Sequence, residues 1–207
     1  MIKEKNLLKK YIPEKAVNSI VELLFSQKGL LLKITKERQT KLGDYKQLNR
    51  FQSRITINYN LNKYRFLITL LHEIAHHLSY KKYGNKIKPH GLEWKKIYGN
   101  LLTEYLKNDI FPAELVPHLK KYAANPKAST SADGDLYLLL SKYDKQANRL
   151  TKYIFELTYG QVFSLPNGTK YQLQEKRRTR YKCLRLDNNK IYLIHKNAEV
   201  IPVETHE

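Results

Sequence analysis

A histidine-rich stretch in the first half of the chain constrains the fold more than any other feature. It reads His-Glu-Ile-Ala-His-His over residues 72–77. In a helix, residues i and i+4 lie about 40° apart around the axis and roughly 6 Å apart along it, so His72 and His76 can bind one metal ion. Glu73 is rotated about 100° from His72 and can reach a water molecule beside that ion without being a ligand. This HExxH spacing is typical of metal-dependent peptide hydrolysis.

The residues around this motif predict a long buried helix. Apolar side chains flank both histidines: Leu67, Ile68, Leu70, Leu71, Ile74, Ala75 and Leu78. Asn60 or Asn62 can cap its start, and Gly84 can end it. Two histidines on a buried helix need partners. They could be core histidines bonded to backbone carbonyls, but we favour a metal site.

The third ligand has two candidates in the segment Pro-His-Gly-Leu-Glu-Trp, residues 89–94. A predicted helix over 92–106 can cross back over the first helix and present His90 to the ion. Glu93 is the alternative, since carboxylates also complete such sites. We favour His90, and expect Glu93 to be a solvated helix residue or a hydrogen-bond partner of a ligand. His77 points about 100° away from His76, so we expect it to pack or to support a ligand.

These motifs resemble the SprT-like family of zinc metallopeptidases, which includes the Spartan proteases of DNA–protein crosslink repair. The resemblance rests on HEIAHH, on KPHGLEW, and on the runs at residues 38–43 and 54–60, and it covers about Ser19 to Leu106. It implies that His72, His76 and His90 bind Zn²⁺ and that Glu73 is the catalytic glutamate. It also implies a link to DNA. Many bacterial relatives end in a cysteine-rich zinc ribbon, which this chain cannot form because it has only Cys183.

Composition adds weaker constraints. The 207 residues include 38 Lys and Arg against 19 Asp and Glu, a net charge of +19. This charge favours a polyanionic partner such as nucleic acid, but a lysine-rich solvated surface explains it equally well. A single cysteine allows no internal disulfide, and we expect Cys183 to be a small apolar residue in a strand. The sequence contains no signal-peptide pattern and no apolar run of 18 residues, so we expect a cytoplasmic protein that does not span a membrane.

The pattern along the chain predicts an α+β fold with a small zincin-like (HExxH) metalloprotease core and a C-terminal antiparallel β module. We expect the SprT-like domain over residues 1–122, a linker over 123–150 and a basic β module over 151–207. Before the metal helix we expect a helix over 7–26 and strands over 30–36 and 54–59. If residues 54–58 lie at the sheet edge beside the cleft, an extended substrate can pair with them. Residues 136–143 slightly favour a helix.

The C-terminal module should consist of short strands with period-two alternation: 153–158, 160–165, 170–175, 180–186 and 190–195, with a further candidate strand at 198–203. Hairpin turns are expected at Asn167-Gly168 and at residues 187–189. The densest basic cluster consists of Lys176, Arg177, Arg178, Arg180 and Lys182. It could contact phosphates while Tyr171, Tyr181 and Tyr192 stack on bases. Equally, the cations could form a solvated face and the tyrosines a core.

The leading hypothesis is a zinc-dependent endopeptidase that acts on proteins, including DNA-associated ones. Glu73 would activate the water, and Tyr80 or Tyr83 could help to stabilise the oxyanion. The alternative is a nucleic-acid-binding or regulatory protein with a structural metal site, which would have no need of Glu73. A third possibility is hydrolysis of a substrate other than a peptide, since this chemistry polarises any carbonyl.

Overall fold

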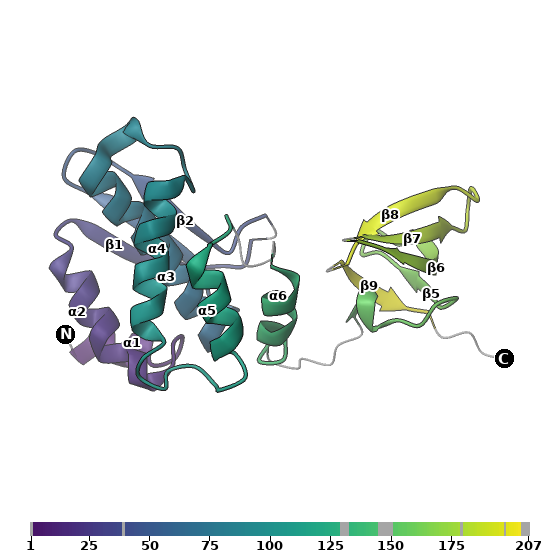
Figure 1. Ribbon diagram of the computed structural model, residues 1–207, viewed down its shortest axis with the longest axis horizontal. Helices are drawn as coiled ribbons and strands as arrows, with labels where there is room; N and C mark the ends of the chain where they lie inside the picture. The colour runs from purple at the N-terminus through teal and green to yellow at the C-terminus, as the bar shows by residue number, and fades with distance from the viewer. Residues whose placement is uncertain are drawn as a thin grey trace. The chain divides into compact units, whose positions relative to one another are not determined.

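The computed structural model describes residues 2–38, 40–128, 133–144, 151–178, 180–196 and 198–203. It divides into two compact units, Met1–Lys145 and Gln146–Glu207 (Figure 1). Helices and a mixed sheet build the first unit, and an antiparallel sheet builds the second. This confirms the expected α+β class. Among the described residues, every helix is too short or too polar to span a lipid bilayer.

The first unit contains six described helices around a three-stranded sheet (Figure 1). The helices are α1 (Ile2–Leu8), α2 (Val17–Ser26), α3 (Lys63–Tyr83), α4 (Leu92–Tyr105), α5 (Val116–Ala124) and α6 (Gly134–Ser141), with single 3₁₀ turns at Glu14–Ala16 and Gly84–Lys86. The strands are β1 (Leu30–Thr35), β2 (Gly43–Gln47) and β3 (Ser53–Asn58). Helix α3 contacts β2, β3 and α4, so it lies at the centre of the unit.

The boundaries of α3 follow from local sequence. The Asn62 side chain accepts hydrogen bonds from the backbone N–H groups of Tyr64 and Arg65, at 3.1 and 2.9 Å, and so caps the helix start. Gly84 ends the helix with φ +62°, a conformation that costs a glycine little. Both ends were predicted from these residues, and the long buried helix between them is confirmed.

The helical structure expected over residues 7–26 is confirmed in part, because residues 14–26 are helical but residues 9–13 are not. The chain leaves the helical path after α1 and re-enters it through the 3₁₀ turn that precedes α2. Pro13 explains the break, because it has no N–H to donate and disfavours the helical conformation at Ile12. Ile12 and Ala16 are nonetheless fully buried, so this connection is part of the core.

Residues 54–58 do not form the sheet edge, so the condition for an extended substrate to pair with them is not met. The strand order is β1-β3-β2, with β1 parallel and β2 antiparallel to β3. Strand β3 is therefore paired on both sides. Its Ser53 contacts His77 of α3, whereas Thr56 and Asn58, on the other face, accept hydrogen bonds from Arg38. Periodicity alone does not distinguish a central from an edge strand.

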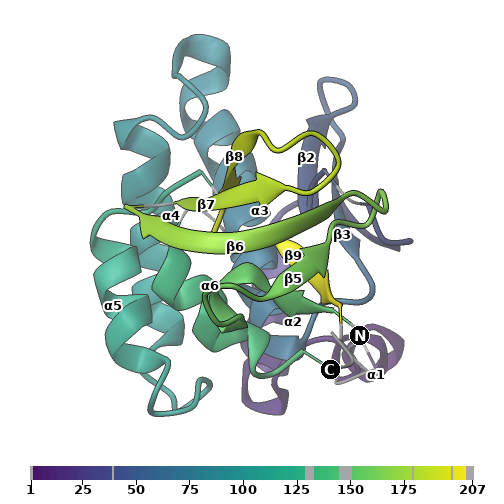
Figure 2. The same ribbon diagram turned by 90° about the vertical axis from the view of Figure 1, so that its right-hand side faces the viewer.

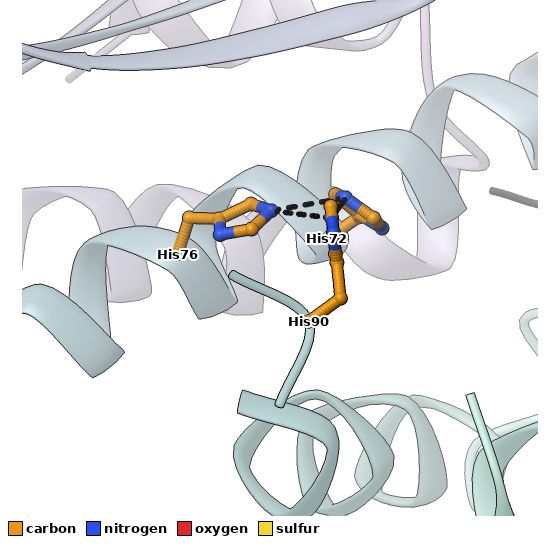
Figure 3. Close-up of side chains that lie close together, drawn as sticks. All are labelled: His72, His76 and His90. Atoms are coloured by element: carbon orange, nitrogen blue, oxygen red, sulfur yellow. Dashed lines mark hydrogen bonds between the residues drawn. The ribbon is translucent and has the colours of Figure 1, made fainter. Parts of the chain in front are cut away.

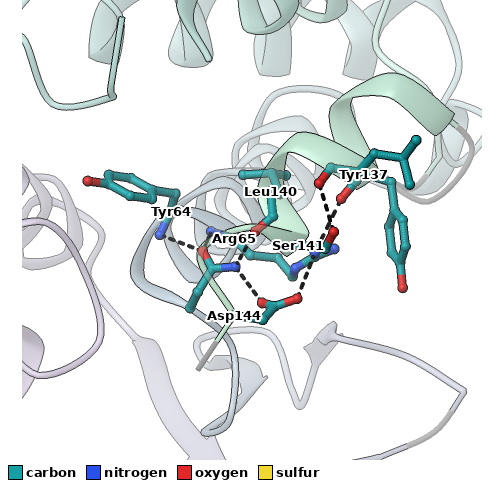
Figure 4. Close-up of polar contacts among 8 residues, drawn as sticks. Tyr64, Arg65, Tyr137, Leu140, Ser141 and Asp144 are labelled. Atoms are coloured by element: carbon teal, nitrogen blue, oxygen red, sulfur yellow. Dashed lines mark hydrogen bonds and ion pairs between the residues drawn. The ribbon is translucent and has the colours of Figure 1, made fainter. Parts of the chain in front are cut away.

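The first unit extends beyond the expected boundary at residue 122. Leu136 and Leu140 of α6 are fully buried in the core that α3 belongs to. The Asn62 side chain donates to the Leu140 carbonyl at 2.9 Å, and buried Arg65 contacts the Asp144 carboxylate at 3.2 Å (Figure 4). These bonds attach α6 to the start of α3, so most of the expected linker is part of the folded unit.

The second unit is a six-stranded antiparallel sheet with its own core. Its strand order is β4-β9-β5-β6-β7-β8, and the long β6 crosses the middle of the unit (Figure 2). The strands are β4 (Lys152–Tyr153), β5 (Val162–Ser164), β6 (Lys170–Arg177), β7 (Arg180–Arg185), β8 (Ile191–His195) and β9 (Glu199–Pro202).

Local sequence accounts for most of the second unit. Cys183 is buried in β7, as expected. The two predicted turns contain Gly168 at φ +82° and Asn189 at φ +53°, residues that tolerate positive φ. The strand expected at 153–158 is wrong, because a 3₁₀ turn over Ile154–Glu156 follows β4. The Glu156 carboxylate accepts the Tyr153 backbone N–H at 2.6 Å and so stabilises this turn.

Candidate metal centre

Three histidines converge on one point in the first unit. His72 and His76 project from the same face of α3, and His90 approaches from the loop before α4 (Figure 3). The Nε2 atoms lie 3.2 Å apart for His72 and His76, 3.0 Å for His76 and His90, and 3.2 Å for His72 and His90. Among the described residues, these three form the one group of side chains with the spacing to hold a metal ion.

The loop that carries His90 has an unusual backbone. His90 has φ +58°, a left-handed conformation that costs a residue with a side chain of order 1 kcal/mol or more. The following turn is closed by a hydrogen bond from the Gly91 N–H to the Lys88 carbonyl at 2.9 Å. This geometry turns the His90 ring towards α3. The rival candidate, Glu93, is exposed and lies outside the group.

Trp94 forms the support behind the histidines. Its side chain is 1% exposed, and its ring lies 4.7 Å from those of His72 and His90 and 5.1 Å from that of His76, centre to centre. Sequence reasoning assigned it no role. The spacing of four residues between Trp94 and Tyr98 could have revealed this role, because it places both rings on one face of α4. The Tyr98 ring also lies 5.3 Å from that of His72, centre to centre.

The histidines are held in the form that binds metal. Burial, reinforced by the neighbouring imidazoles, lowers the pKa of His72 to about 3 and that of His76 to about 4. Burial also lowers the pKa of His90. All three rings are therefore neutral at physiological pH, and neutral imidazole is a metal ligand.

The donor set fits a tetrahedral ion. Zinc–nitrogen bonds of about 2.0–2.1 Å at tetrahedral angles place ligand nitrogens about 3.3 Å apart. The three Nε2 separations of 3.0–3.2 Å are close to this value. Three nitrogens of one type, all on neutral rings, are the ligands that zinc and similar divalent metals prefer.

Glu73 lies beside the histidines with its side chain 6% exposed. Its carboxylate fits against β2 only because position 43 is glycine: a Cβ on Gly43 would lie 2.6 Å from Glu73 Oε1 and 2.7 Å from Thr69 Cγ2. The Tyr45 backbone N–H donates a hydrogen bond to this carboxylate. Sequence reasoning identified Glu73 but not Gly43, whose role depends on how closely β2 approaches α3.

The electrostatic environment of Glu73 favours proton uptake. Burial, and to a lesser extent the nearby Asp44 carboxylate, raises its pKa to about 8. Arg38 and Lys41 act in the opposite direction. A divalent metal ion bound by the neighbouring imidazoles would also favour the charged carboxylate. Glu73 is thus a carboxylate whose protonation can change near neutral pH, as proton transfer requires.

Arg38 and Asn58 attach the loop before β2 to the end of β3. The Arg38 guanidinium donates to Asn58 Oδ1 at 2.9 Å and to Thr56 Oγ1 at 3.0 Å. The Asn58 amide donates to the carbonyls of Arg38 and Lys41, at 3.1 and 3.0 Å. These bonds join the run at 38–43 to the run at 54–60. They hold the loop that leads to Gly43, which lies against Glu73.

The three histidines and Glu73 line a cleft of about 510 Å³. One wall is formed by the loop and strand around Gly43 to Tyr45, and α3 forms the floor. Neither Tyr80 nor Tyr83, proposed as oxyanion donors, lines the cleft; Tyr45 and Tyr98 do. The structure therefore gives no support to the two tyrosines named from sequence.

His77 faces away from the cleft, as its position on the helix predicts. Its Nδ1 lies 3.0 Å from Ser53 Oγ in β3, and its side chain is 4% exposed. Burial, with a smaller contribution from the charge of Lys81, lowers its pKa to about 4. His77 therefore connects α3 to the sheet.

In the second unit, the basic cluster divides between two faces of the β6–β7 hairpin. Strand register places Arg177 opposite Arg180, while Lys182 pairs with Glu175 on the same outer face. Lys176 is opposite Tyr181, on the other face. Glu175 contacts Arg177 at 2.8 Å and Lys182 at 3.7 Å and offsets part of their charge. Arg178 is exposed near the turn.

Two of the three tyrosines that we expected to stack on bases are buried. Tyr171 and Tyr181 are 6% and 7% exposed and belong to the second core. Tyr192 is more exposed, at 36%, and its ring lies 5.8 Å from the Arg185 guanidinium. The structure supports the alternative expectation of a charged outer face over a core that contains tyrosines.

The first unit is thus a mixed α+β domain that can bind a metal ion through three histidines and that carries a buried glutamate beside them. Residues 14–110 match the model of the SprT-like family. This segment, which contains His72, Glu73, His76 and His90, is similar to the SprT-like family. The similarity is consistent with a metallopeptidase-like function. No curated protein and no solved structure matches the chain significantly.

Proposed function

We propose that the protein is a zinc-dependent endopeptidase of SprT-like type, with a zincin-like catalytic core. The observation that carries this proposal is the position of Glu73, which is buried in the same cleft as three convergent imidazoles. A metal site with a purely structural role needs no carboxylate beside its ligands. A peptidase needs one as the general base.

In this proposal His72, His76 and His90 hold the ion. When bound, Zn²⁺ supplies a Lewis acid that polarises the carbonyl of the scissile peptide and lowers the pKa of water. Glu73 accepts a proton from the attacking water and passes it to the amine of the leaving group. Trp94 keeps the imidazoles in place, and Gly43 lets the Glu73 carboxylate reach the cleft.

The free edge of β2 is the proposed binding site for the substrate backbone. Among the described residues, β2 pairs with β3 alone, so no strand lies along its other edge. Gly43, Asp44 and Tyr45 line the cleft along this strand. An extended peptide that pairs with β2 is held mainly by main-chain hydrogen bonds. Strand β2 takes the role that residues 54–58 would have had as an edge strand.

Proteolysis of a loosely folded protein tests the proposal. Wild type should cleave it, a chelator should stop cleavage, and Zn²⁺ should restore it. Glu73→Gln keeps the size of the side chain but removes the base, and should lower the rate by about 10²–10⁴-fold. Exposed Glu93→Gln is the matched control and should cleave like wild type. Equal rates for wild type and Glu73→Gln would contradict the proposal.

Nucleic acid is a second proposed partner, which would bring DNA-associated proteins to the cleft. Its support is the net charge of +19 and the cations Arg177, Arg180 and Lys182 on one face of the second unit. Phosphate contacts need such exposed cations. Adding duplex or single-stranded DNA to the proteolysis assay tests it: stimulation that disappears at high salt supports it, and no effect of DNA at low salt contradicts it.

A further inference from the structure

The first unit contains a second hollow, away from the metal cleft. It lies between α1, α2, β1 and Tyr59, which follows β3, and is called the β1 groove below. Its volume is about 880 Å³, and it shares no lining residue with the cleft. The sheet order β1-β3-β2 places β1 at one edge and β2, which lines the cleft, at the other. The β1 groove and the cleft therefore belong to opposite edges of one sheet.

The β1 groove follows the edge of the strand over its whole length. Every residue over 30–36 lines it. Consecutive strand residues point to opposite faces, so a hollow that touches each of them borders the edge of the strand and not one face alone. Among the described residues β1 pairs with β3 alone, and no strand lies along its other edge. Seven strand residues span about 20 Å, which suits an extended segment better than a small molecule.

The inner wall of the β1 groove is apolar. Leu30, Leu32 and Ile34 pack against the main core of the first unit. Their register partners in β3 include Ile55 and Ile57, which are fully buried. Helices α1 and α2 supply the facing wall with six more apolar side chains: Leu7, Leu8, Tyr11, Val21, Leu24 and Phe25.

Four large apolar side chains of the β1 groove are left about half exposed. Leu7, Phe25, Leu31 and Tyr59 have exposed fractions between 48% and 54%. Apolar side chains scattered singly over a surface are normal, whereas a group of them around one hollow marks a contact site. An edge strand with exposed apolar residues also invites pairing with another chain. A protein segment in extended conformation satisfies both features, because it pairs with the strand and fills the hollow.

The charge along β1 indicates which kind of segment fits. Residues 28–36 include Lys28, Lys33 and Lys36, all of them exposed, and no acidic residue. Glu4 of α1 is the one acidic side chain among the described residues that line the groove. A segment that lies along β1 therefore gains from carboxylates of its own, since opposite charges on neighbouring strands attract and like charges repel.

We propose that the β1 groove binds a protein partner through an extended segment in which apolar and acidic residues alternate. The segment adds a fourth strand to the sheet, beside β1. Its apolar side chains fill the groove between Leu32 and Phe25, which line it. Its carboxylates lie on the other face of the sheet beside Lys33, whose register partner there is Thr56. A second copy of this chain fits less well, because a net charge of +19 opposes self-association.

Fluorescence anisotropy with a designed peptide and the full-length protein tests this proposal. The probe is a capped peptide of about nine residues, enough to cover β1, in which Val and Glu alternate. In the control peptide Lys replaces Glu, and it should bind at least about tenfold more weakly. Phe25→Ala and Lys33→Glu should each raise the Kd of the Glu peptide by about fivefold to tenfold. Phe51→Ala and Lys120→Glu are the matched controls, since both residues are exposed and neither lines the groove.

N-methylation of the probe tests strand pairing separately from apolar contact. Methyl groups on every second backbone nitrogen remove the donors along one edge of an extended peptide. Only one edge of the peptide can face β1. Methylation of either the Val or the Glu residues should therefore abolish binding, while methylation of the other set should change the Kd by less than about threefold. Equal effects of the two sets would overturn the added strand.

The proposal is also overturned if the Glu peptide does not bind at up to about 1 mM, if the Glu and Lys peptides bind equally, or if Phe25→Ala leaves the Kd unchanged. A dimer in sedimentation that Phe25→Ala dissociates would assign the groove to a second copy instead. Displacement of the probe by a single-stranded DNA oligonucleotide whose own binding is weakened in Phe25→Ala would assign it to nucleic acid. The assay needs neither metal nor cleavage, so its outcome is independent of the proposed peptidase.

Discussion

The clusters of functional interest in the two units differ in how their side chains are arranged. In the first unit, residues as far apart in sequence as His72 and His90 bring their Nε2 atoms within 3.2 Å of each other. In the second unit, basic residues close together in sequence diverge, so that Lys176 and Arg177 lie on opposite faces of a hairpin. Residues four apart on a helix, such as His72 and His76, project from the same face and can converge. Consecutive residues in a strand point to opposite faces, so a continuous basic run is divided between them.

Burial makes the same distinction. The imidazoles of the first unit lie in a site that lowers the pKa of His72 to about 3 and keeps it neutral. The cations of the second unit are largely exposed, and Glu175 neutralises part of their charge. Exposed ion pairs of this kind contribute little to stability. The first cluster has the spacing to hold one metal ion, whereas the second forms part of a charged surface.

Replacement of a metal ligand should have the largest effect. His76→Ala removes one of three convergent nitrogens, and proteolysis should fall by roughly 10³-fold or more, since a catalytic ion supplies several kcal/mol of transition-state stabilisation. Triple substitution of Arg177, Arg180 and Lys182 by Gln should leave cleavage of a substrate free of DNA within about twofold. Comparable losses in both variants would erase the distinction between the two clusters.

The next effect concerns stability and the division into two units. Leu140→Ala and Leu173→Ala each empty a fully buried site, one in each core, and should cost about 2–5 kcal/mol. Zinc stabilises only the unit that binds it. Leu140→Ala should therefore lower the midpoint temperature of the unfolding transition that responds to zinc. Leu173→Ala should lower the midpoint temperature of the transition that does not respond to zinc.

Calorimetry with and without zinc checks this pair of variants. If Leu140→Ala left the zinc-responsive transition unchanged, α6 would not belong to the first unit. If Leu173→Ala lowered that transition as much as Leu140→Ala does, the two cores would not be separate folding units.

A smaller effect is the pH dependence of the metal-free protein. The pKa values of His72, His76 and His77 are lowered from 6.5 to about 3, 4 and 4. The unfolded chain therefore binds more protons between about pH 3 and 6.5, and stability rises with pH there. Glu73, with its pKa raised from 4.5 to about 8, has the opposite effect and reduces stability up to about pH 8.

These three histidines, together with His90, whose pKa is also lowered, outweigh one glutamate below pH 6.5, and the effect of Glu73 dominates above it. Stability from these groups should therefore be greatest near about pH 6.5 and fall towards pH 8. Urea unfolding of the chelated protein across this range measures it. In Glu73→Gln the fall between pH 6.5 and 8 should disappear, and an unchanged fall would mean that another group causes it.

The smallest effect should come from the basic face of the second unit. Substituting Arg177, Arg180 and Lys182 by Gln should change the free energy of unfolding by less than about 0.5 kcal/mol, because all three are at the surface. If this face binds DNA, the slope of log K against log salt should decrease by roughly 2–3. Anisotropy titrations of full-length wild type and variant at several salt concentrations measure it, and identical slopes would rule out this face.

Features that depend on neighbouring residues could be predicted from the sequence. Helix α3 has an Asn62 cap, a long apolar run and Gly84 at its end, so its bounds and the convergence of His72 with His76 follow from helix geometry alone. The hairpin turns at Gly168 and Asn189 are equally local.

Features that depend on distant pairing could not be predicted in this way. Strand β3 alternates like an edge strand but pairs on both sides. The turn-rich composition after residue 122 suggested a linker, yet Leu136 and Leu140, four residues apart, bury α6 against the core. Gly43 and Ala128 line the cleft because separate elements approach each other closely. The residues next to them in the sequence do not indicate this approach.

The most direct test of the account is the metal content per chain of wild type, His90→Ala and Glu73→Gln, purified in parallel and measured by elemental analysis. The three convergent histidines predict one zinc in wild type, one in Glu73→Gln, and a substoichiometric amount in His90→Ala. A full complement of zinc in His90→Ala, or none in wild type, would contradict the assignment of the metal centre.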